Sequence, residues 1–326
     1  MTLPQVVHIP VSMKASWSLF GLRVISALAI VTLVPFVPPR SPGAETFRVA
    51  TYNVEGYLDL ATQTRTPKSL EARKKVREAI KAINPDVLAL QEIGNPSALE
   101  ELRASLKLEG LEFPYWEHVG GHDTNIHVAV LSKFPFTARH PHTNETFLLS
   151  GRRYHASRGF ADLDIQISSD FSFTLISGHL KSKRPVGSGD ESELRLEEAK
   201  LLRNIIEQRL AADPAIDLIV LGDFNDTKDS QTLKTILGRG KRKLVDTRPA
   251  ERNGDSGCAG VGNSRNITWT HYFATEDSYS RIDYLLLSSG MAARWLTNET
   301  YVLASPDWGV GSDHRPITAA FSTVER

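Results

Sequence analysis

The sequence predicts an α/β (α+β) fold in which two mixed β-sheets pack face to face and helices cover their outer sides. Three observations lead to this prediction. Short apolar runs rich in β-branched residues, typical of strands, outnumber the segments with helical periodicity. The helical segments are scattered between the strands rather than grouped together. No internal repeat or linker divides the chain, and its 326 residues suffice for one large domain.

Helices are expected where apolar residues recur every three or four positions. The first should end at Asn84-Pro85, because proline drives the residue before it out of the helical conformation. The second should begin with Ser97 as its N-cap, and Glu100 three residues later would complete a capping box. The expected helices are 68–83, 97–108, 191–210 and 230–237.

Strands are expected at the apolar runs between these helices. Segments 159–167 and 171–177 should pair as a hairpin around the polar turn 168–170, whereas the glycine-rich stretch 251–266 has no apolar period and should form a mobile loop. The expected strands are 47–54, 87–91, 127–132, 159–167, 171–177, 218–221, 267–273, 282–287, 300–303 and 317–321.

The apolar strand 218–221 ends abruptly in Gly222, Asp223, Phe224 and Asn225. Asp223 and Asn225 are two residues apart, so an extended backbone points both side chains to the same side. A carboxylate and an amide at the end of a rigid strand suit a hard cation and a phosphate oxygen. The alternative is an ordinary polar turn, since these residue types are also common in turns.

The other expected strands favour the first interpretation, because several of them also meet polar residues at one end. Ligands at the ends of neighbouring strands converge in one crevice, which is the usual place of a site in an α/β sheet. The residues at these junctions are Asn53, Glu55, Glu92, His179, Asp283, Asp313 and His314.

The ordered series TYNVEG, LQE, GHL, GDFN, RIDY and SDHRP resembles the motifs of the endonuclease/exonuclease/phosphatase superfamily, from about residue 47 to residue 321. That superfamily includes deoxyribonucleases, abasic-site endonucleases, sphingomyelinases and inositol polyphosphate 5-phosphatases. The resemblance implies a four-layer α/β sandwich and a metal-dependent hydrolase of phosphoester bonds.

Glu92 ends a buried strand, and a buried carboxylate is costly without a partner, so we expect it to be the principal ligand of Mg²⁺ or Mn²⁺. The alternative is a salt-bridged core carboxylate. The resemblance adds Asn53 and Asp313 to this metal site. It also places an acidic residue where Glu55 stands, although aspartate is usual there in the abasic-site enzymes.

A second group consists of His314 and Asp283, in which the carboxylate would fix the imidazole tautomer and stabilise its charged form. His314 would bind the scissile phosphate and act as general base or acid. Asp223 is the rival general base, with Asn225 holding the phosphate or the attacking water. The resemblance makes His179 a donor to a phosphate oxygen.

Cations close to His179 could form a basic rim that collects phosphate. Lys181 and Lys183 follow it in sequence, and Arg158 precedes the neighbouring strand, accompanied by Arg152, Arg153 and Arg184. A solvated loop explains such a run equally well.

The leading functional interpretation is an exported, monomeric endonuclease or exonuclease-type phosphodiesterase that acts on nucleic acid. The alternative is a lipid or inositol-phosphate phosphodiesterase or phosphatase of the same fold. A third possibility, a binding module with a dead site, conflicts with the complete set of motif residues. The formal net charge of zero argues against a dedicated non-specific nucleic-acid binder.

The N-terminus differs from the rest of the chain. A basic start with Lys14 and Arg23, the apolar segment 24–34 and a proline- and small-residue-rich stretch are typical of a secretory signal peptide. An uncleaved membrane anchor is the alternative, because 17–37 approaches the length of a span. We therefore expect a signal or anchor with its linker at 1–44 and the catalytic domain at 45–326. Cys258, the single cysteine, excludes an intramolecular disulfide.

Overall fold

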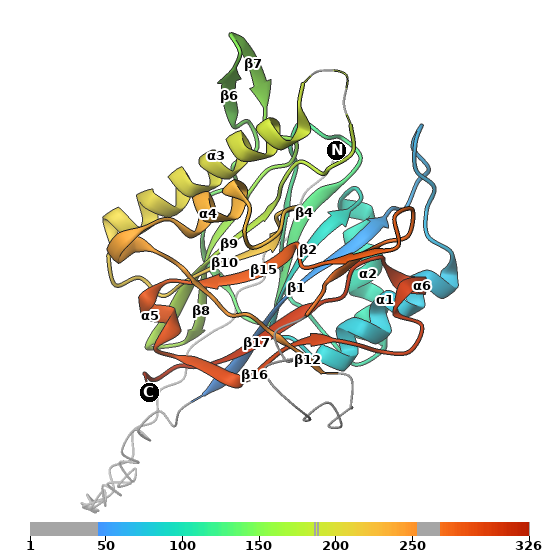
Figure 1. The fold of residues 1–326 in the computed structure, drawn as a ribbon. Helices are drawn as coiled ribbons and strands as arrows, with labels where there is room; N and C mark the ends of the chain where they lie inside the picture. The colour runs from blue at the N-terminus through green and yellow to red at the C-terminus, as the bar shows by residue number, and fades with distance from the viewer. Residues whose placement is uncertain (1–44, 186, 188, 253–267, 326) are drawn as a thin grey trace, which may run out of the picture. The chain divides into compact units, whose positions relative to one another are not determined.

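The structure, a computed structural model, describes residues 45–185, 187, 189–252 and 268–325, and two large mixed sheets dominate it (Figure 1). Sheet A has, in spatial order, β12 (Ala250–Arg252), β16 (Trp295–Leu303), β17 (Ile317–Ser322), β1 (Thr46–Tyr57), β2 (Val87–Ile93), β4 (His127–Ser132) and β3 (Tyr115–Val119). Sheet B has β11 (Val245–Asp246), β15 (Asp283–Leu287), β10 (Leu218–Asp223), β9 (Phe171–His179), β8 (Ala161–Ser168) and β5 (Phe136–Arg139).

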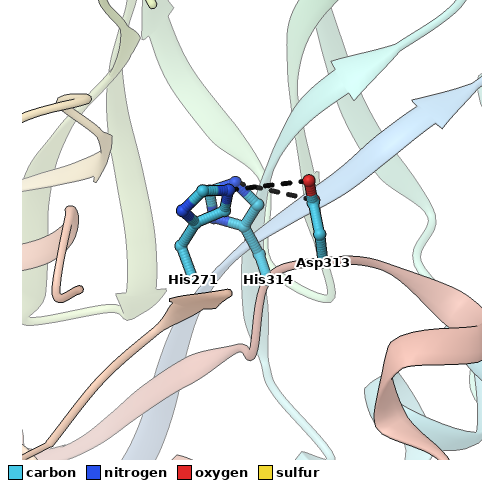
Figure 2. A group of neighbouring side chains, drawn as sticks. All are labelled: His271, Asp313 and His314. Atoms are coloured by element: carbon cyan, nitrogen blue, oxygen red, sulfur yellow. Dashed lines mark ion pairs between the residues drawn. The ribbon is translucent and has the colours of Figure 1, made fainter. Parts of the chain in front are cut away.

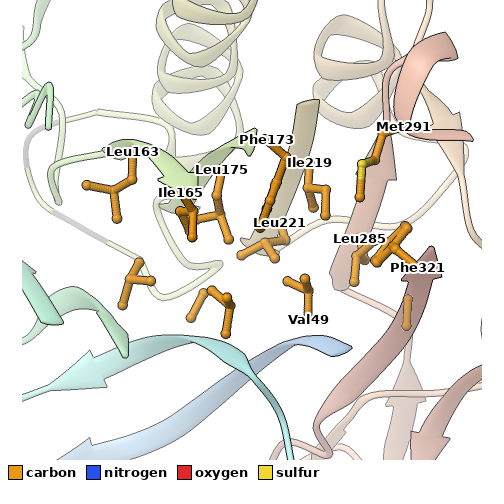
Figure 3. Packing of buried hydrophobic residues seen from close by; sticks show 14 of the residues in the cluster. Val49, Leu163, Ile165, Phe173, Leu175, Ile219, Leu221, Leu285, Met291 and Phe321 are labelled. Atoms are coloured by element: carbon orange, nitrogen blue, oxygen red, sulfur yellow. The ribbon is translucent and has the colours of Figure 1, made fainter. Parts of the chain in front are cut away.

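The main core lies between the two sheets (Figure 3). Phe47 of β1 stacks on Phe173 of β9 with 5.2 Å between ring centroids, so an aromatic pair joins the sheets. The central strands are buried on both faces, as β10 and β17 show. In β10, Ile219 and Leu221 face sheet A, whereas the alternate residues Leu218 and Val220 join the core beneath the helices of sheet B. Continuous apolar strands are therefore required at the centre of each sheet.

Helices cover the outer face of each sheet, which completes the expected four layers (Figure 1). The main helices are α1 (Leu70–Ile83) and α2 (Pro96–Leu108) on sheet A, and α3 (Glu191–Ala212) and α4 (Gln231–Leu237) on sheet B. Helix α1 ends at Ile83, and its C-cap Asn84 has a left-handed backbone (φ 43°) directly before Pro85, where the sequence predicts the end of the helix. Shorter helical turns are η1 (Gly240–Arg242), α5 (Ser289–Ala292) and α6 (Trp308–Gly311).

The predicted capping box of α2 is wrong. The helix begins one residue earlier, at Pro96, and Asn95 occupies the cap position without a side-chain capping bond. Proline suits the first helical position, because its fixed φ is already helical and no donor is lost there. The hydroxyl of Ser97 donates to Asp59 instead.

Several strands differ from the predictions. The predicted strand 300–303 is the end of the longer β16, and of 267–273 only β13 (His271–Phe273) is a strand, paired with β14 (Ser278–Ser280) outside both large sheets. Residues 251–252 of the expected loop belong to β12, and 253–267 lie outside the described residues, as does the predicted signal or anchor at 1–44. The strands that sequence reasoning missed are β3, β5, β11, β12, β14 and the hairpin β6 (Thr146–Leu149) with β7 (Arg152–His155).

Gly222 allows β10 to approach β9 closely beside Gly178. Its φ is +136°, and a Cβ built there would lie 2.0 Å from the Gly178 carbonyl oxygen. We expect Gly222→Ala to destabilise the domain by about 3 kcal/mol, because backbone strain and backbone overlap add. Thermal unfolding should then shift down by roughly 6–12 °C. Gly110, with φ +88° and open space around its Cβ position, provides the control. An equal loss for Gly110→Ala would contradict the close-approach argument.

Candidate active site

The ends of central strands from both sheets meet at one edge of the sandwich. The parallel neighbours β1 and β2 carry Asn53 and Glu92 at their carboxyl ends, and the parallel neighbours β9 and β10 carry His179 and Asp223. Strand β15 runs antiparallel to β10 and begins with Asp283 opposite Asp223. The Asn53 amide Nδ2 donates to Asp223 Oδ2 at 2.9 Å, which joins the two sheets through buried side chains.

His314 and Asp283 form the pair that the sequence predicts. His314 Nδ1 lies 2.8 Å from Asp283 Oδ2, and the other ring nitrogen, Nε2, lies 3.7 Å from Asp223 Oδ2. The loop that carries His314 is fixed, because Ser312 Oγ accepts from the His314 N–H at 3.0 Å and donates to the Asn53 carbonyl at 2.7 Å. Burial lowers the pKa of His314, but the carboxylates of Asp283 and Asp223 outweigh it and raise that pKa to about 10.

Asp223 contacts several of the site residues at this edge, among them Asn53, Asn225 and His314. Burial, followed by the negative charge of Asp283, raises the pKa of Asp223 to about 7, against the opposing effects of His314 and Asn53. Its Oδ1 accepts the backbone N–H of Asn225 at 2.9 Å, and the Asn225 amide donates to the Leu180 carbonyl at 3.0 Å. The carboxylate and the amide therefore stand together in a preformed turn.

His179 lies on the other side of Asp223, with Nε2 3.4 Å from Asp223 Oδ2. Burial, together with the positive charge of Arg158, keeps the pKa of His179 well below its ordinary value. Its Nδ1 is buried and has no hydrogen-bond partner among the described residues. His179 is therefore a neutral imidazole, able to donate from one nitrogen.

Each of the three acidic residues Glu55, Glu92 and Asp313 has a different basic or histidine partner. Glu92 Oε2 accepts from Arg65 Nη1 at 2.6 Å, and Glu55 Oε2 accepts from Lys68 Nζ at 3.1 Å and from the Asp313 N–H at 3.2 Å. Burial raises the pKa of Glu92, but Arg65 and Arg158 bring it below the ordinary value. Burial, then the charge of Asp313, raises the pKa of Glu55.

These carboxylates and the Asn53 amide are hard oxygen donors, and they fit a divalent cation better than a soft one. The structure nevertheless does not gather all of them around one point. In the described residues, the groups of three ligand atoms within 4.8 Å of one another are His271–Asp313–His314 (Figure 2) and Asp223–Asp283–His314. Glu92 belongs to neither group, and its carboxylate is paired with Arg65.

Several residues of the site have a strained backbone. Glu55, Glu92 and Asn225 all have left-handed φ angles, of 48°, 60° and 53°. This conformation costs a non-glycine residue of order 1–3 kcal/mol and persists only where the surroundings enforce it. All three residues lie at or near the end of a strand, where the polar residues of the site come together.

Sequence reasoning missed His271, Arg65 and Lys68. The ring of His271 lies 4.5 Å from that of His314, and its Nε2 lies 3.6 Å from Asp313 Oδ2. A histidine inside the predicted strand 267–273 was the only signal for it. Arg65 and Lys68 lie in a polar segment without periodicity, and nothing local indicates which remote carboxylates they meet.

The structure brings only part of the predicted basic rim to the site. Arg158 is buried, and its charge acts on both Glu92 and His179. Lys181 Nζ instead donates within its own loop, at 3.1 Å, to the carbonyls of Ser182 and Arg184. Lys183 is exposed, and the remaining predicted residues Arg152 and Arg153 belong to the β6–β7 hairpin, which projects from the sandwich (Figure 1).

Glu198 of α3 ties together the loops that carry Arg158 and Lys181. It is only 2% exposed, and its carboxylate accepts from the Ser157 N–H at 2.7 Å, the Ser157 hydroxyl at 2.7 Å and the Lys181 N–H at 2.5 Å. Three donors face two carboxylate oxygens. Glu198 is therefore a positioning residue, and an amide in its place would oppose a donor with another donor.

We expect Glu198→Gln to raise KM for a phosphodiester about tenfold, with a smaller change in kcat, because the loop that holds Arg158 beside Glu92 and His179 loses its support. The free energy of unfolding should also fall by about 1–3 kcal/mol, since a buried donor loses its acceptor. Glu197→Gln on the same helix, where the carboxylate pairs with Lys200, is the matched control for steady-state kinetics and thermal unfolding. A purely structural role would lower stability and leave KM unchanged.

Solved structures with the same fold share little sequence with this chain. A truncated TDP2 from Caenorhabditis elegans aligns with a TM-score of 0.56 and 18% identity, over 85% of this chain and 97% of its own. The human nocturnin catalytic domain aligns with a TM-score of 0.57 and 17% identity, over 85% of this chain and 97% of its own. Sphingomyelinase C from Streptomyces griseocarneus aligns with a TM-score of 0.57 and 18% identity, over 85% of this chain and 99% of its own. At these identities the likeness establishes the fold.

The four-layer sandwich places carboxylates and histidines where the strands of both sheets end, an arrangement suited to phosphoester hydrolysis. The model of the Endonuclease/Exonuclease/phosphatase family matches residues 50–314, and the chain belongs to this family. Among curated proteins, none matches it in sequence.

Proposed function

We propose that this protein is an exported phosphodiesterase that depends on Mg²⁺ or Mn²⁺ and cleaves nucleic acid. The observation that carries the proposal is the convergence of Asp223, Asp283 and His314 within 4.8 Å at the edge where the carboxyl ends of strands from both sheets meet. Phosphodiester cleavage requires charge neutralisation, an activated water and help for the leaving oxygen, and this edge offers residues for each.

Glu92, Asp313, Glu55 and Asn53 would hold the cation. A bound divalent cation would neutralise phosphate charge and acidify a water molecule. Glu92 would then share its charge between the cation and Arg65, which lies 2.6 Å away.

The remaining steps fall to the protein's own groups. Asp283 orients His314 through Nδ1, so that Nε2 can bind a phosphate oxygen and give its proton to the leaving oxygen as the P–O bond breaks. Asp223, with Asn225 beside it, receives the proton of the attacking water, and His179 and Arg158 stabilise the negative charge of the phosphate.

A lipid phosphodiester is the second candidate, and the fold shared with sphingomyelinase C favours it. The test is a panel of plasmid DNA, RNA, sphingomyelin, inositol phosphates and bis-p-nitrophenyl phosphate with Mg²⁺, each repeated in EDTA. Nucleic-acid cleavage that EDTA abolishes would support the first proposal. Cleavage of sphingomyelin alone would replace it with the second, and hydrolysis of none would overturn both.

Export rests on the N-terminal 44 residues, whose basic start and apolar segment are typical of a cleaved signal. Within the described part of the chain, no helix is both long and apolar enough to cross a bilayer. Mass spectrometry of the protein from outside its native cell should find a first residue in the forties of the sequence. Recovery of the full-length chain from membranes alone would show that 1–44 is an anchor.

A further inference from the structure

A recess of about 430 Å³ lies at the end of sheet B away from the candidate active site. Lys241, Arg242 and Lys243 line it beside Leu244 and Ser288. Ser288 directly follows the last residue of β15, a strand that begins with Asp283 in the candidate active site. Ser288 is five residue steps along the extended chain from Asp283, which corresponds to roughly 16 Å. The recess is therefore distinct from the site described above.

The segment around the recess is strongly basic in a chain whose formal net charge is zero. Residues 238–248 contain a single acid, Asp246, and Arg281 already binds it through both oxygens, at 2.9 and 2.6 Å. Its cations, all exposed, are Arg239, Lys241, Arg242, Lys243 and Arg248.

Most of this positive charge is uncompensated. Arg242 pairs with Glu207 at 3.0 Å, but Glu207 also binds Arg203. Within the described residues, Lys241 and Lys243 form no ion pair. Adjacent like charges repel one another, so this arrangement favours the binding of an anion that relieves the repulsion.

The turn that carries these cations is held in place before any ligand arrives. The buried Arg203 of α3 donates to the Arg242 carbonyl at 2.9 Å and to the Ile236 carbonyl at 3.0 Å. The Leu244 N–H donates to the Leu237 carbonyl at 2.8 Å, and the Leu244 side chain is 2% exposed. A preorganised cluster of cations loses less conformational entropy on binding than flexible lysines would.

We infer that this recess is a second site, which binds the phosphate group of a soluble ligand, either a nucleotide or a nucleic-acid strand. The volume is within the range of small-ligand pockets, and lysine and arginine are the usual partners of phosphate. The choice of phosphate over other anions rests on the proposed function. An anionic membrane is less suited to it, because Val245 is the only large hydrophobic residue exposed in 238–248.

The direct test is nuclear magnetic resonance of the full chain with ¹³C-methylated lysines, titrated with inorganic pyrophosphate in EDTA. Lys241→Gln and Lys243→Gln assign the two resonances. Both should shift saturably, whereas those of Lys74 and Lys107, which are paired with Glu78 and Glu112, should not. Small, linear shifts at every exposed lysine would mean that only ionic screening occurs and would overturn the proposal.

A second measurement distinguishes the sources of the phosphate. Binding of a single-stranded DNA dodecamer in EDTA should weaken at least about tenfold in the double variant Lys241→Gln/Lys243→Gln, and its salt slope should fall by about 1.4, or about 0.7 per lysine. The control, Lys74→Gln/Lys107→Gln, removes the same charge and should bind as the wild type does. Tight pyrophosphate binding with no gain from the dodecamer would indicate a nucleotide-sized ligand. Binding to phosphatidylglycerol vesicles alone would overturn the proposal in favour of a membrane.

Failure of this proposal and failure of the proposed function have different signatures. Hydrolysis of bis-p-nitrophenyl phosphate, a small diester, should be unchanged in the double variant, because the recess lies at the opposite end of β15 from Asp283. An inactive wild-type enzyme that still binds pyrophosphate at Lys241 would retain the second site and refute only the hydrolytic function.

Discussion

Glu92→Gln should reduce phosphodiester hydrolysis by about a hundredfold or more while leaving the fold intact. The substitution preserves the side chain's shape and removes the charge that we propose for cation binding. Thermal stability should change little, because relief of the repulsion from Glu55 and Asp313 offsets the lost pairing with the partly exposed Arg65.

The measurement is kcat/KM as a function of Mg²⁺ concentration, together with calorimetric titration of Mn²⁺. Glu109→Gln is the matched control, since it breaks a similar ion pair, with Arg77 at 2.6 Å, at the C-terminal end of α2. Hydrolysis that is indifferent both to EDTA and to Glu92→Gln would refute the proposed mechanism.

Losses at Asp283 and His314 should not add, because the carboxylate acts through the imidazole. Asp283→Asn keeps the side chain's shape but removes the charge that lies 2.8 Å from Nδ1. We expect a loss of about a hundredfold, carried mainly in kcat, and at least as large a loss for His314→Ala. The double variant should resemble His314→Ala alone.

A double-mutant cycle on kcat/KM measures this coupling. His179→Ala is the comparison, because His179 approaches Asp223 from β9 and, among the described residues, forms neither an ion pair nor a hydrogen bond with Asp283. Its loss should therefore multiply more nearly with either substitution. Fully multiplicative losses for Asp283 and His314 would show that they do not act as a pair, and the roles at this edge would have to be reassigned.

The strand-end residues could be predicted because their signal is local. An apolar run that stops at Asp223 or Glu92 occupies a few adjacent positions, and parallel strands of one sheet necessarily end at one edge. This rule is enough to bring together the polar residues that follow parallel strands of the same sheet. The family's motif order then extended the prediction to the facing sheet.

The remainder depends on contacts between distant segments. Arg65 reaches Glu92 across 27 residues of sequence, and no short pattern encodes which carboxylate a polar loop will meet. Strands such as β6 and β7 were missed because they pair with each other and stand apart from the large sheets, so they lack the apolar period of a core strand. Helix α2 begins one residue before the predicted start, because Pro96 suits the first helical position and Asn95, rather than Ser97, takes the cap position.

The position of β1 constrains when this chain can fold. Strand β1 lies between β2 and β17, and its residues 46–51 pair with residues 317–322 at the other end of the sequence. Until the ribosome has made residues 317–322, sheet A therefore lacks one neighbour of its central strand, and Phe47 lacks Phe321, its aromatic partner at 5.7 Å. Domains dominated by such remote pairings fold slowly, and an open strand edge attracts other chains in the meantime. A nascent or truncated chain that ends before residue 317 should thus depend on chaperones to stay soluble, since β1 gains its second neighbour only once residues 317–322 are present.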